Sequence, residues 1–248
     1  MRVLILGGST EASALARLLA GRKEIEATLS LAGRTERPAA APIAVRVGGF
    51  GGVEGLLSYL RRERIEAVID ATHPFAVQMS LNAEEACARL GLPRLVLTRP
   101  PWRPVEGDRW IEVKDAAEAA SALGRKARCV FLTVGRLSLP AFAAAPQHHY
   151  LVRAIDTPQG LEALPNHGLI LSRPPFSLEN ERRLMLEAKL DMLVSKNSGG
   201  EATYAKIEAA RGLGLPVVMI RRPKADGTPA LHDPQAAVEW ILRQRRTP

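Results

Sequence analysis

Hydrophobic residues in this chain occur in short continuous runs, separated by longer stretches in which they recur every three or four positions. Continuous runs predict strands that helices cover on both faces, whereas a half-exposed strand would alternate apolar and polar residues. Strands are expected at residues 2–6, 26–31, 43–47, 66–70, 94–98, 129–134, 150–155, 168–172, 191–195 and 216–220. Helices are expected at residues 10–20, 53–64, 77–90, 178–189, 202–212 and 234–245. This alternation predicts an α/β protein with doubly wound, mainly parallel sheets.

An internal echo divides the pattern into two similar halves. Residues 88–100 read ARLGLPRLVLTRP and residues 211–223 read RGLGLPVVMIRRP. In both segments a helix ends at Gly-Leu-Pro, an apolar strand follows, and the strand ends at Arg-Pro. Such helix-ending and strand-ending residues are also common in unrelated α/β proteins. We therefore expect two doubly wound α/β domains, residues 1–125 and 126–248.

The proline-rich stretch at residues 99–109, RPPWRPVEGDR, is expected to be a loop. After it, short runs at residues 110–113 and 115–123 are expected to close the first domain. A new alternation then begins at residue 129, which places the boundary near residue 125.

The composition and net charge of the chain limit the kinds of ligand and partner that it can bind. The chain has 248 residues, 46% of them hydrophobic, and a net charge of +8. Its two cysteines lie outside any metal-ligand spacing, so we expect reduced thiols and no metal site. No apolar run approaches about 18 residues, which predicts a cytoplasmic protein that makes no membrane contact. The positive charge favours an anionic partner, but it is spread along the chain and aromatic residues make up only 4%, which argues against nucleic acid.

The first turn, GGSTEA at residues 7–12, lies between a strand and a helix at the position where dinucleotide folds bind a pyrophosphate. It departs from GxGxxG, because serine holds the third position and alanine the last. The alternative is a tight turn in which Ser9 or Thr10 caps the helix. The residues predicted to contact a cofactor here are Gly7, Gly8, Ser9, Thr10 and Glu11.

The end of the second strand favours NADP(H) over NAD(H). NAD enzymes place a carboxylate there to bind the ribose hydroxyls, whereas this chain has Ala-Gly-Arg34-Thr35. A guanidinium suits a 2′-phosphate, so Arg34 and Thr35 are predicted cofactor contacts. The alternative for Arg34 is a solvated loop arginine.

Two further loops follow predicted strands of the first half. Four glycines surround Phe50 in the segment 48–52, and close approach to a ligand or a bent junction would explain them. DATHPFA at 70–76 includes His73, which could act as an acid near neutral pH or, with Thr72, cap a helix that Pro74 begins. The predicted cofactor contacts in these loops are Gly49, Phe50, Gly51, Thr72, His73 and Pro74.

In the second half, SKNSGG at residues 195–200 offers Lys196, Asn197 and Ser198 beside a glycine pair. SRPPFS at residues 172–177 offers Arg173 after another predicted strand. Both loops suit an anion, although ordinary polar loops with helix caps would look similar. The chain has no Walker A loop, GxSxG or HExxH motif.

Taken in order, GGSTEA, AGR, VGGFGG, DATHPFA, RPPFSLENE and SKNSGG resemble the precorrin-6A reductase family of cobalamin biosynthesis, from Met1 to about Pro223. The resemblance implies an NADPH-dependent enzyme that reduces one double bond of the precorrin-6A macrocycle, or of its cobalt analogue, to give precorrin-6B. It also implies two Rossmann-like domains with the cofactor and the macrocycle between them.

The implied substrate carries acetate and propionate arms, which fits the positive charge of the chain. The residues predicted to bind these carboxylates are Arg99, Arg173, Lys196, Asn197, Ser198 and Arg222. The proton that accompanies the hydride would come from Lys196, His73 or water. Two readings from other classes stay open at this point: a non-enzymatic two-domain binder of an anionic small molecule, and a nucleic-acid-binding protein.

Overall fold

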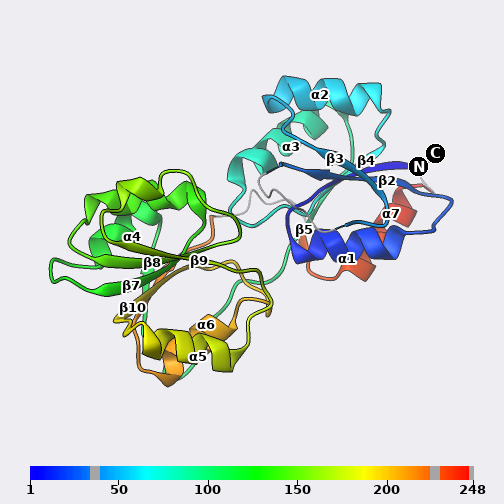
Figure 1. Cartoon of the computed structure of the whole chain (residues 1–248). Coiled ribbons are helices and arrows are strands. Elements are labelled where there is room, and N and C mark those ends of the chain that lie inside the picture. The colour runs from blue at the N-terminus through cyan, green and yellow to red at the C-terminus, as the bar shows by residue number, and fades with distance from the viewer. Residues whose placement is uncertain (34–39, 224–229, 246–248) are drawn as a thin grey trace. The chain divides into compact units, whose positions relative to one another are not determined.

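The computed structural model describes residues 1–33, 40–223 and 230–245 (Figure 1). The chain forms two compact units, one made of Met1–Pro100 with Pro223–Pro248 and the other of Pro101–Arg222. Each unit contains one six-stranded parallel sheet with helices on both faces.

The sheet of the first unit consists of β1 (Arg2–Leu6), β2 (Glu26–Leu31), β3 (Ala44–Val47), β4 (Ala67–Asp70), β5 (Arg94–Leu97) and β12 (Ala230–Leu231). The strand order is β12-β5-β4-β1-β2-β3, and all pairs are parallel. Its helices are α1 (Thr10–Leu19), α2 (Gly52–Arg62), α3 (Val77–Leu90) and α7 (Pro234–Gln244).

The central strand β1 shows why the sequence reads as continuous apolar runs. Val3 and Ile5 pack into a core with α1 and α7, whereas Leu4 and Leu6 pack into a second core with α2 and α3. Figure 1 shows these helix pairs on opposite faces of the sheet. Because successive side chains of a strand point to opposite faces, a strand covered on both sides needs apolar residues throughout.

The sheet of the second unit consists of β6 (Trp110–Val113), β7 (Cys129–Thr133), β8 (His149–Ala154), β9 (His167–Leu171), β10 (Met192–Lys196) and β11 (Val217–Ile220). Its order is β6-β11-β10-β7-β8-β9, again all parallel. The helices α5 (Leu178–Glu187) and α6 (Ala205–Gly212) build the core on one face. The helix α4 (Ala116–Ala122) lies on the other face, where it contacts the 3-10 segment η1 (Arg136–Ala144) (Figure 1). A shorter 3-10 segment, η2 (Leu161–Ala163), precedes β9.

The two echo segments occupy equivalent positions in the two sheets. The first leads into β5, which pairs with β4 and β12, and the second leads into β11, which pairs with β10 and β6. After each echo the chain passes from one unit to the other at its Arg-Pro pair. The first sheet therefore receives its edge strand β12 from beyond the second crossing, whereas β6, the first strand after the first crossing, forms an edge of the second sheet.

This crossing gives domain limits that differ from the predicted division at residue 125. Residues 110–123, expected to close the first domain, form β6 and α4 of the second unit, and residues 234–244 form α7 of the first. The hydrophobic pattern shows that a strand forms but not which sheet edge it completes. The prediction also missed η1, which contains Pro140, and β12, which is only two residues long.

Within the part of the chain that the structure describes, no helix is long and apolar enough to cross a bilayer.

Candidate functional site

The first candidate site lies where the strand order of the first sheet reverses. From β1 the chain continues to β2 and β3 on one side, whereas β4 and β5 lie on the other. Open parallel sheets bind ligands at such a switch point, outside the carboxyl ends of the strands. The turn at residues 7–9 follows β1 and the loop at residues 71–76 follows β4, so the two predicted cofactor loops lie side by side.

The turn after β1 leaves its backbone open to a ligand. The Gly7 N–H donates to the Ser30 carbonyl at 2.8 Å, and a Cβ on Gly7 would lie 2.7 Å from Cδ1 of Leu29. Gly8 has φ +118°, and no heavy atom lies within 4 Å of the position that its Cβ would take. The positive φ favours glycine at position 8, whereas a side chain at position 7 would have to displace the ends of the neighbouring leucine side chains; the open space at Gly8 fits the close approach of a phosphate.

The Ser9 hydroxyl is engaged within the fold. Its Oγ accepts a hydrogen bond from the Ala12 N–H at 3.1 Å, which caps α1, and donates to the Ala71 carbonyl at 2.7 Å. The capping role that the sequence offered as an alternative is therefore present. The second bond joins the turn after β1 to the loop after β4 across the switch point.

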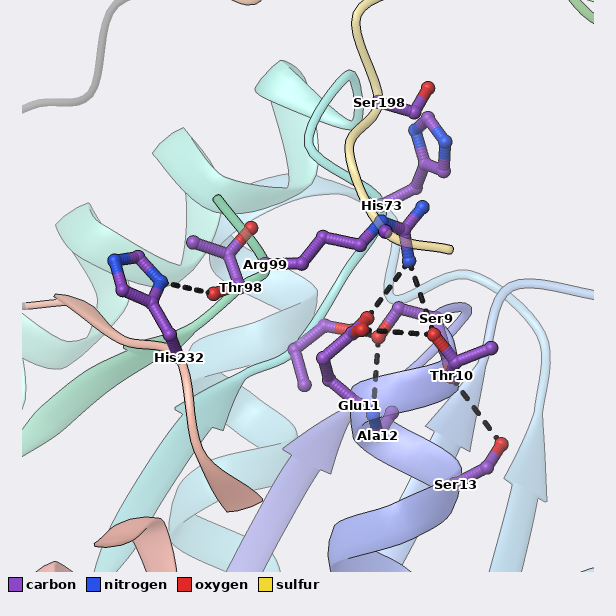
Figure 2. Close-up of polar contacts among 12 residues, drawn as sticks. Ser9, Thr10, Glu11, Ala12, Ser13, His73, Thr98, Arg99, Ser198 and His232 are labelled. Carbon is purple, nitrogen blue, oxygen red and sulfur yellow. Dashed lines mark hydrogen bonds and ion pairs between the residues drawn. The ribbon is translucent and has the colours of Figure 1, made fainter. Parts of the chain in front are cut away.

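Arg99 lies over the first turn of α1 (Figure 2). Its Nη1 donates to Oε2 of Glu11 at 2.9 Å and to Oγ1 of Thr10 at 3.3 Å, while the Thr10 hydroxyl donates to Oε1 of Glu11 at 2.9 Å. The Arg99 and Glu11 side chains are only 15% and 14% exposed. The guanidinium neutralises a carboxylate that would otherwise repel an anion at this helix N-terminus.

The same contacts set the ionisation of Glu11. Burial of the carboxyl group opposes ionisation, but its own backbone N–H, the Arg99 charge and the Thr10 hydroxyl outweigh burial, so the pKa of Glu11 lies below its ordinary value. A lowered pKa adds stability above the ordinary value near 4.5, and this contribution is lost as the pH falls through the folded-state pKa.

We therefore expect Glu11→Gln to lower the free energy of unfolding at about pH 7 by about 1–3 kcal/mol, because the largely buried hydrogen bond to Arg99 loses its charged acceptor. The difference between variant and wild type should shrink as the pH falls below the ordinary value near 4.5 and through the lowered pKa of Glu11 in the folded protein. Urea unfolding of both proteins across this pH range measures it. A difference that stays constant with pH would contradict the role of ionised Glu11.

The loop after β4 is held by the buried carboxylate of Asp70. Its Oδ1 accepts from the Thr72 hydroxyl at 2.7 Å and from the Thr72 N–H at 3.2 Å. Nδ1 of His73 accepts from the Phe75 N–H at 3.3 Å, so a neutral His73 carries its proton on Nε2. The helix α3 begins at Val77 without a side-chain cap, so the alternative in which His73 and Thr72 would cap a helix that Pro74 begins is not found.

The loop after β3 bends sharply where α2 begins. Gly48, Gly51 and Gly52 have φ values of +122°, +80° and +86°. Phe50 packs edge-on against Tyr59 of α2 and lies under the guanidinium of Arg46, whose Cζ is 3.8 Å from the ring centroid. The sequence prediction missed Arg46, although a lone charge in the apolar run IAVRV was a usable signal.

The predicted residues Arg34 and Thr35 lie outside the described residues, so their predicted role in cofactor binding stays a prediction.

The second candidate site follows β10, which adjoins β7 at the switch point of the second sheet. Lys196 ends β10, and the Ser198 carbonyl accepts a hydrogen bond from Nη2 of Arg222 at 2.9 Å. The structure thus brings Lys196, Ser198 and Arg222 to one loop cluster. The amide of Asn197 bonds the backbone of Trp102, accepting from its N–H at 2.8 Å and donating to its carbonyl at 3.0 Å.

The other two predicted carboxylate ligands, Arg173 and Arg99, follow the strands β9 and β5. Arg173 follows the edge strand β9, where its Nη2 donates to Oδ1 of Asp156 at 3.3 Å. Its side chain is 45% exposed. Arg99 belongs to the first unit and pairs with Glu11 at the turn after β1. Of the six predicted substrate residues, Arg99 therefore belongs to the first unit, and the other five follow or end β9, β10 and β11 of the second unit.

Comparison with known proteins identifies the family. A family model described as precorrin-6x reductase CbiJ/CobK matches residues 2–242. The chain belongs to this family. The family resemblance seen in the sequence motifs is thus confirmed, and the protein is an oxidoreductase that acts on a CH–CH bond.

Individual relatives of the precorrin-6x reductase family match over nearly the whole chain. The precorrin-6A reductase of Rhodobacter capsulatus is 45% identical and that of Mycobacterium tuberculosis 47% identical, covering 100% and 97% of this chain and 98% and 97% of their own. The cobalt-precorrin-6A reductase of Priestia megaterium is 26% identical over 99% of this chain and 100% of its own. A solved structure described as CobK precorrin-6A reductase superposes with a TM-score of 0.93 at 45% identity, covering 100% of this chain and 98% of that one.

Proposed function

We propose that this reductase uses NADPH to reduce one double bond of metal-free precorrin-6A, with precorrin-6B and NADP⁺ as products. The reaction consumes one hydride from the dinucleotide and one proton. The observation that carries the proposal is the full-length identity of 45–47% to precorrin-6A reductases. We favour the metal-free substrate because relatives named for the cobalt form are only 26–27% identical.

The first unit is the proposed dinucleotide site. Its strand order reverses between β1 and β4, and the backbone at Gly8 is open at that point. Ala32 and Gly33 follow β2, where an NAD enzyme would place a carboxylate, and the proposed 2′-phosphate ligands Arg34 and Thr35 come next. Bound NADPH would supply the hydride, and the chain would orient it. The other proposed contacts are Gly7, Ser9, Thr10, Glu11, Gly49, Phe50, Gly51, Thr72, His73 and Pro74.

The second unit supplies most of the proposed substrate ligands. Lys196 and Arg222 supply positive charge to one loop cluster, in which Arg222 bonds the Ser198 carbonyl. Asn197 holds the same loop by bonding the backbone of Trp102. Arg173 and Arg99 are each placed in an ion pair that a substrate carboxylate would have to share or replace. For the proton we keep Lys196 and His73 as the proposed donors, with water as the alternative.

The test uses purified protein with enzymatically made precorrin-6A and NADPH carrying deuterium at the transferred position. We expect the loss of NADPH absorbance to match the change in the macrocycle spectrum, with one deuterium per product molecule by mass spectrometry. The cobalt-containing macrocycle should react more slowly. Oxidation without deuterium in the product, or no oxidation at all, would overturn the proposal.

A further inference from the structure

Arg46 of β3 places a positive charge close to the turn that follows β1. Arg46 of β3 is the register partner of Ser30 of β2, and the Ser30 carbonyl accepts the hydrogen bond from the Gly7 N–H. Only one strand therefore separates Arg46 from the turn after β1. The carboxyl end of β2 is the place where dinucleotide folds recognise the adenosine ribose.

The guanidinium of Arg46 is held rigidly. Nη1 donates to Oγ of Ser30 at 3.0 Å and to the Gly48 carbonyl at 2.6 Å, and Nη2 donates to the Gly49 carbonyl at 2.9 Å. Its plane is also supported by the rings of Phe50 and Tyr59, whose centroids lie 3.8 and 5.1 Å from Cζ. A guanidinium fixed in this way loses little further entropy when it binds a ligand.

The charge of Arg46 has no counter-ion in the part of the chain that the structure describes. A guanidinium has five N–H donors, and the three hydrogen bonds above all go to neutral oxygens. By contrast, Arg2, Arg89 and Arg99 of the same unit each pair with a glutamate. A half-buried cation without a carboxylate is stabilised by an anionic ligand.

We propose that Arg46 binds the 2′-phosphate of NADPH and makes the site prefer NADPH to NADH. The inference rests on the proposed function, because it requires a nicotinamide dinucleotide as the cofactor. The donors that Arg46 does not use in the fold match phosphate oxygens, whereas the 2′-hydroxyl of NADH carries no charge. Arg46 would then act together with Arg34 or without it.

The experiment compares Arg46→Gln and Arg46→Lys with wild type by calorimetric titration. Four probes are used: NADPH, NADH, adenosine 2′,5′-bisphosphate and 5′-AMP. We expect Arg46→Gln to weaken the two 2′-phosphate ligands by about 10- to 100-fold and the other two by less than about twofold. Arg46→Lys keeps the positive charge but lacks the planar, two-pronged guanidinium group, so it should lose less affinity for the 2′-phosphate ligands than Arg46→Gln.

The matched control is Arg61→Gln, which removes an exposed positive charge from α2 in the same unit. Its ligand affinities should stay close to wild type. Thermal unfolding checks that each variant folds, and Arg46→Lys carries the test if Arg46→Gln does not fold.

Three results would overturn the role of Arg46 while leaving the reductase function intact. The first is an equal loss of affinity for NADPH and NADH, which would mean that Arg46 only shapes the glycine loop. The second is unchanged affinity for all four ligands in both Arg46 variants. The third is a wild-type protein that binds NADH as tightly as NADPH. A wild type that binds neither dinucleotide would instead overturn the proposed function and this inference with it.

Discussion

Replacing Gly55 by alanine is expected to destabilise the first unit by about 3 kcal/mol or more, although the residue lies inside a helix. Helix propensity alone predicts the opposite sign, since alanine in a helix interior is favoured over glycine by about 1 kcal/mol. However, a Cβ on Gly55 would overlap the carbonyl oxygen of Phe50 and lie 2.8 Å from its carbonyl carbon. These are backbone atoms, so a side-chain rotation cannot relieve the overlap.

Calorimetric unfolding of Gly55→Ala measures the loss, and two matched variants separate its cause. Gly49→Ala changes the same loop at a position with open space and no positive φ, so its stability should stay near wild type. Gly212→Ala ends α6 in open space and should be neutral or slightly stabilising. If Gly55→Ala behaved like Gly212→Ala, the close packing of α2 on Phe50 would be wrong.

The hydrophobic pattern predicted the strands and helices well because nearly all of them are buried on a definite face. The strand expected at residues 26–31 and the helix expected at residues 77–90 match β2 and α3. The pattern could not assign β12 to its sheet, because β12 lies beyond the second chain crossing from the other strands of the first unit. It also could not show that β6 joins the strands that follow it in the chain rather than those that precede it. Which edge a strand joins is a tertiary choice that its own sequence does not carry.

The candidate site was predicted loop by loop, because ligands bind at strand ends and strand ends are visible in the sequence. The partners within each loop were not visible. Nothing local to SKNSGG predicts that Asn197 bonds the backbone of Trp102, nor does the motif GGSTEA predict that Glu11 meets Arg99. Gly55 was missed as well, since its constraint comes from a carbonyl outside its own helix.

A buried ion pair in the second unit is expected to show the largest effect of a single charge change. Arg153 of β8 donates two hydrogen bonds to Glu181 of α5, at 3.0 and 2.7 Å, and the side chains are only 8% and 3% exposed. The guanidinium also lies over the rings of Phe131 and Phe176, with Cζ 4.7 and 4.2 Å from their centroids. Removing the carboxylate charge would leave a buried cation with only aromatic rings to offset its charge.

Glu181→Gln is therefore expected to lower the free energy of unfolding of the second unit by about 3–5 kcal/mol, because desolvation of Arg153 is no longer offset. Urea unfolding followed by tryptophan fluorescence in a Trp240→Phe background isolates this unit, since Trp102 and Trp110 lie within it. The control Asp156→Asn breaks the more exposed pair with Arg173 and should cost less than about 1 kcal/mol. Replacing both charges, as Arg153→Met with Glu181→Leu, should restore much of the loss. Equal effects of Glu181→Gln and Asp156→Asn would show that water reaches Arg153 and that the pair is not a buried one.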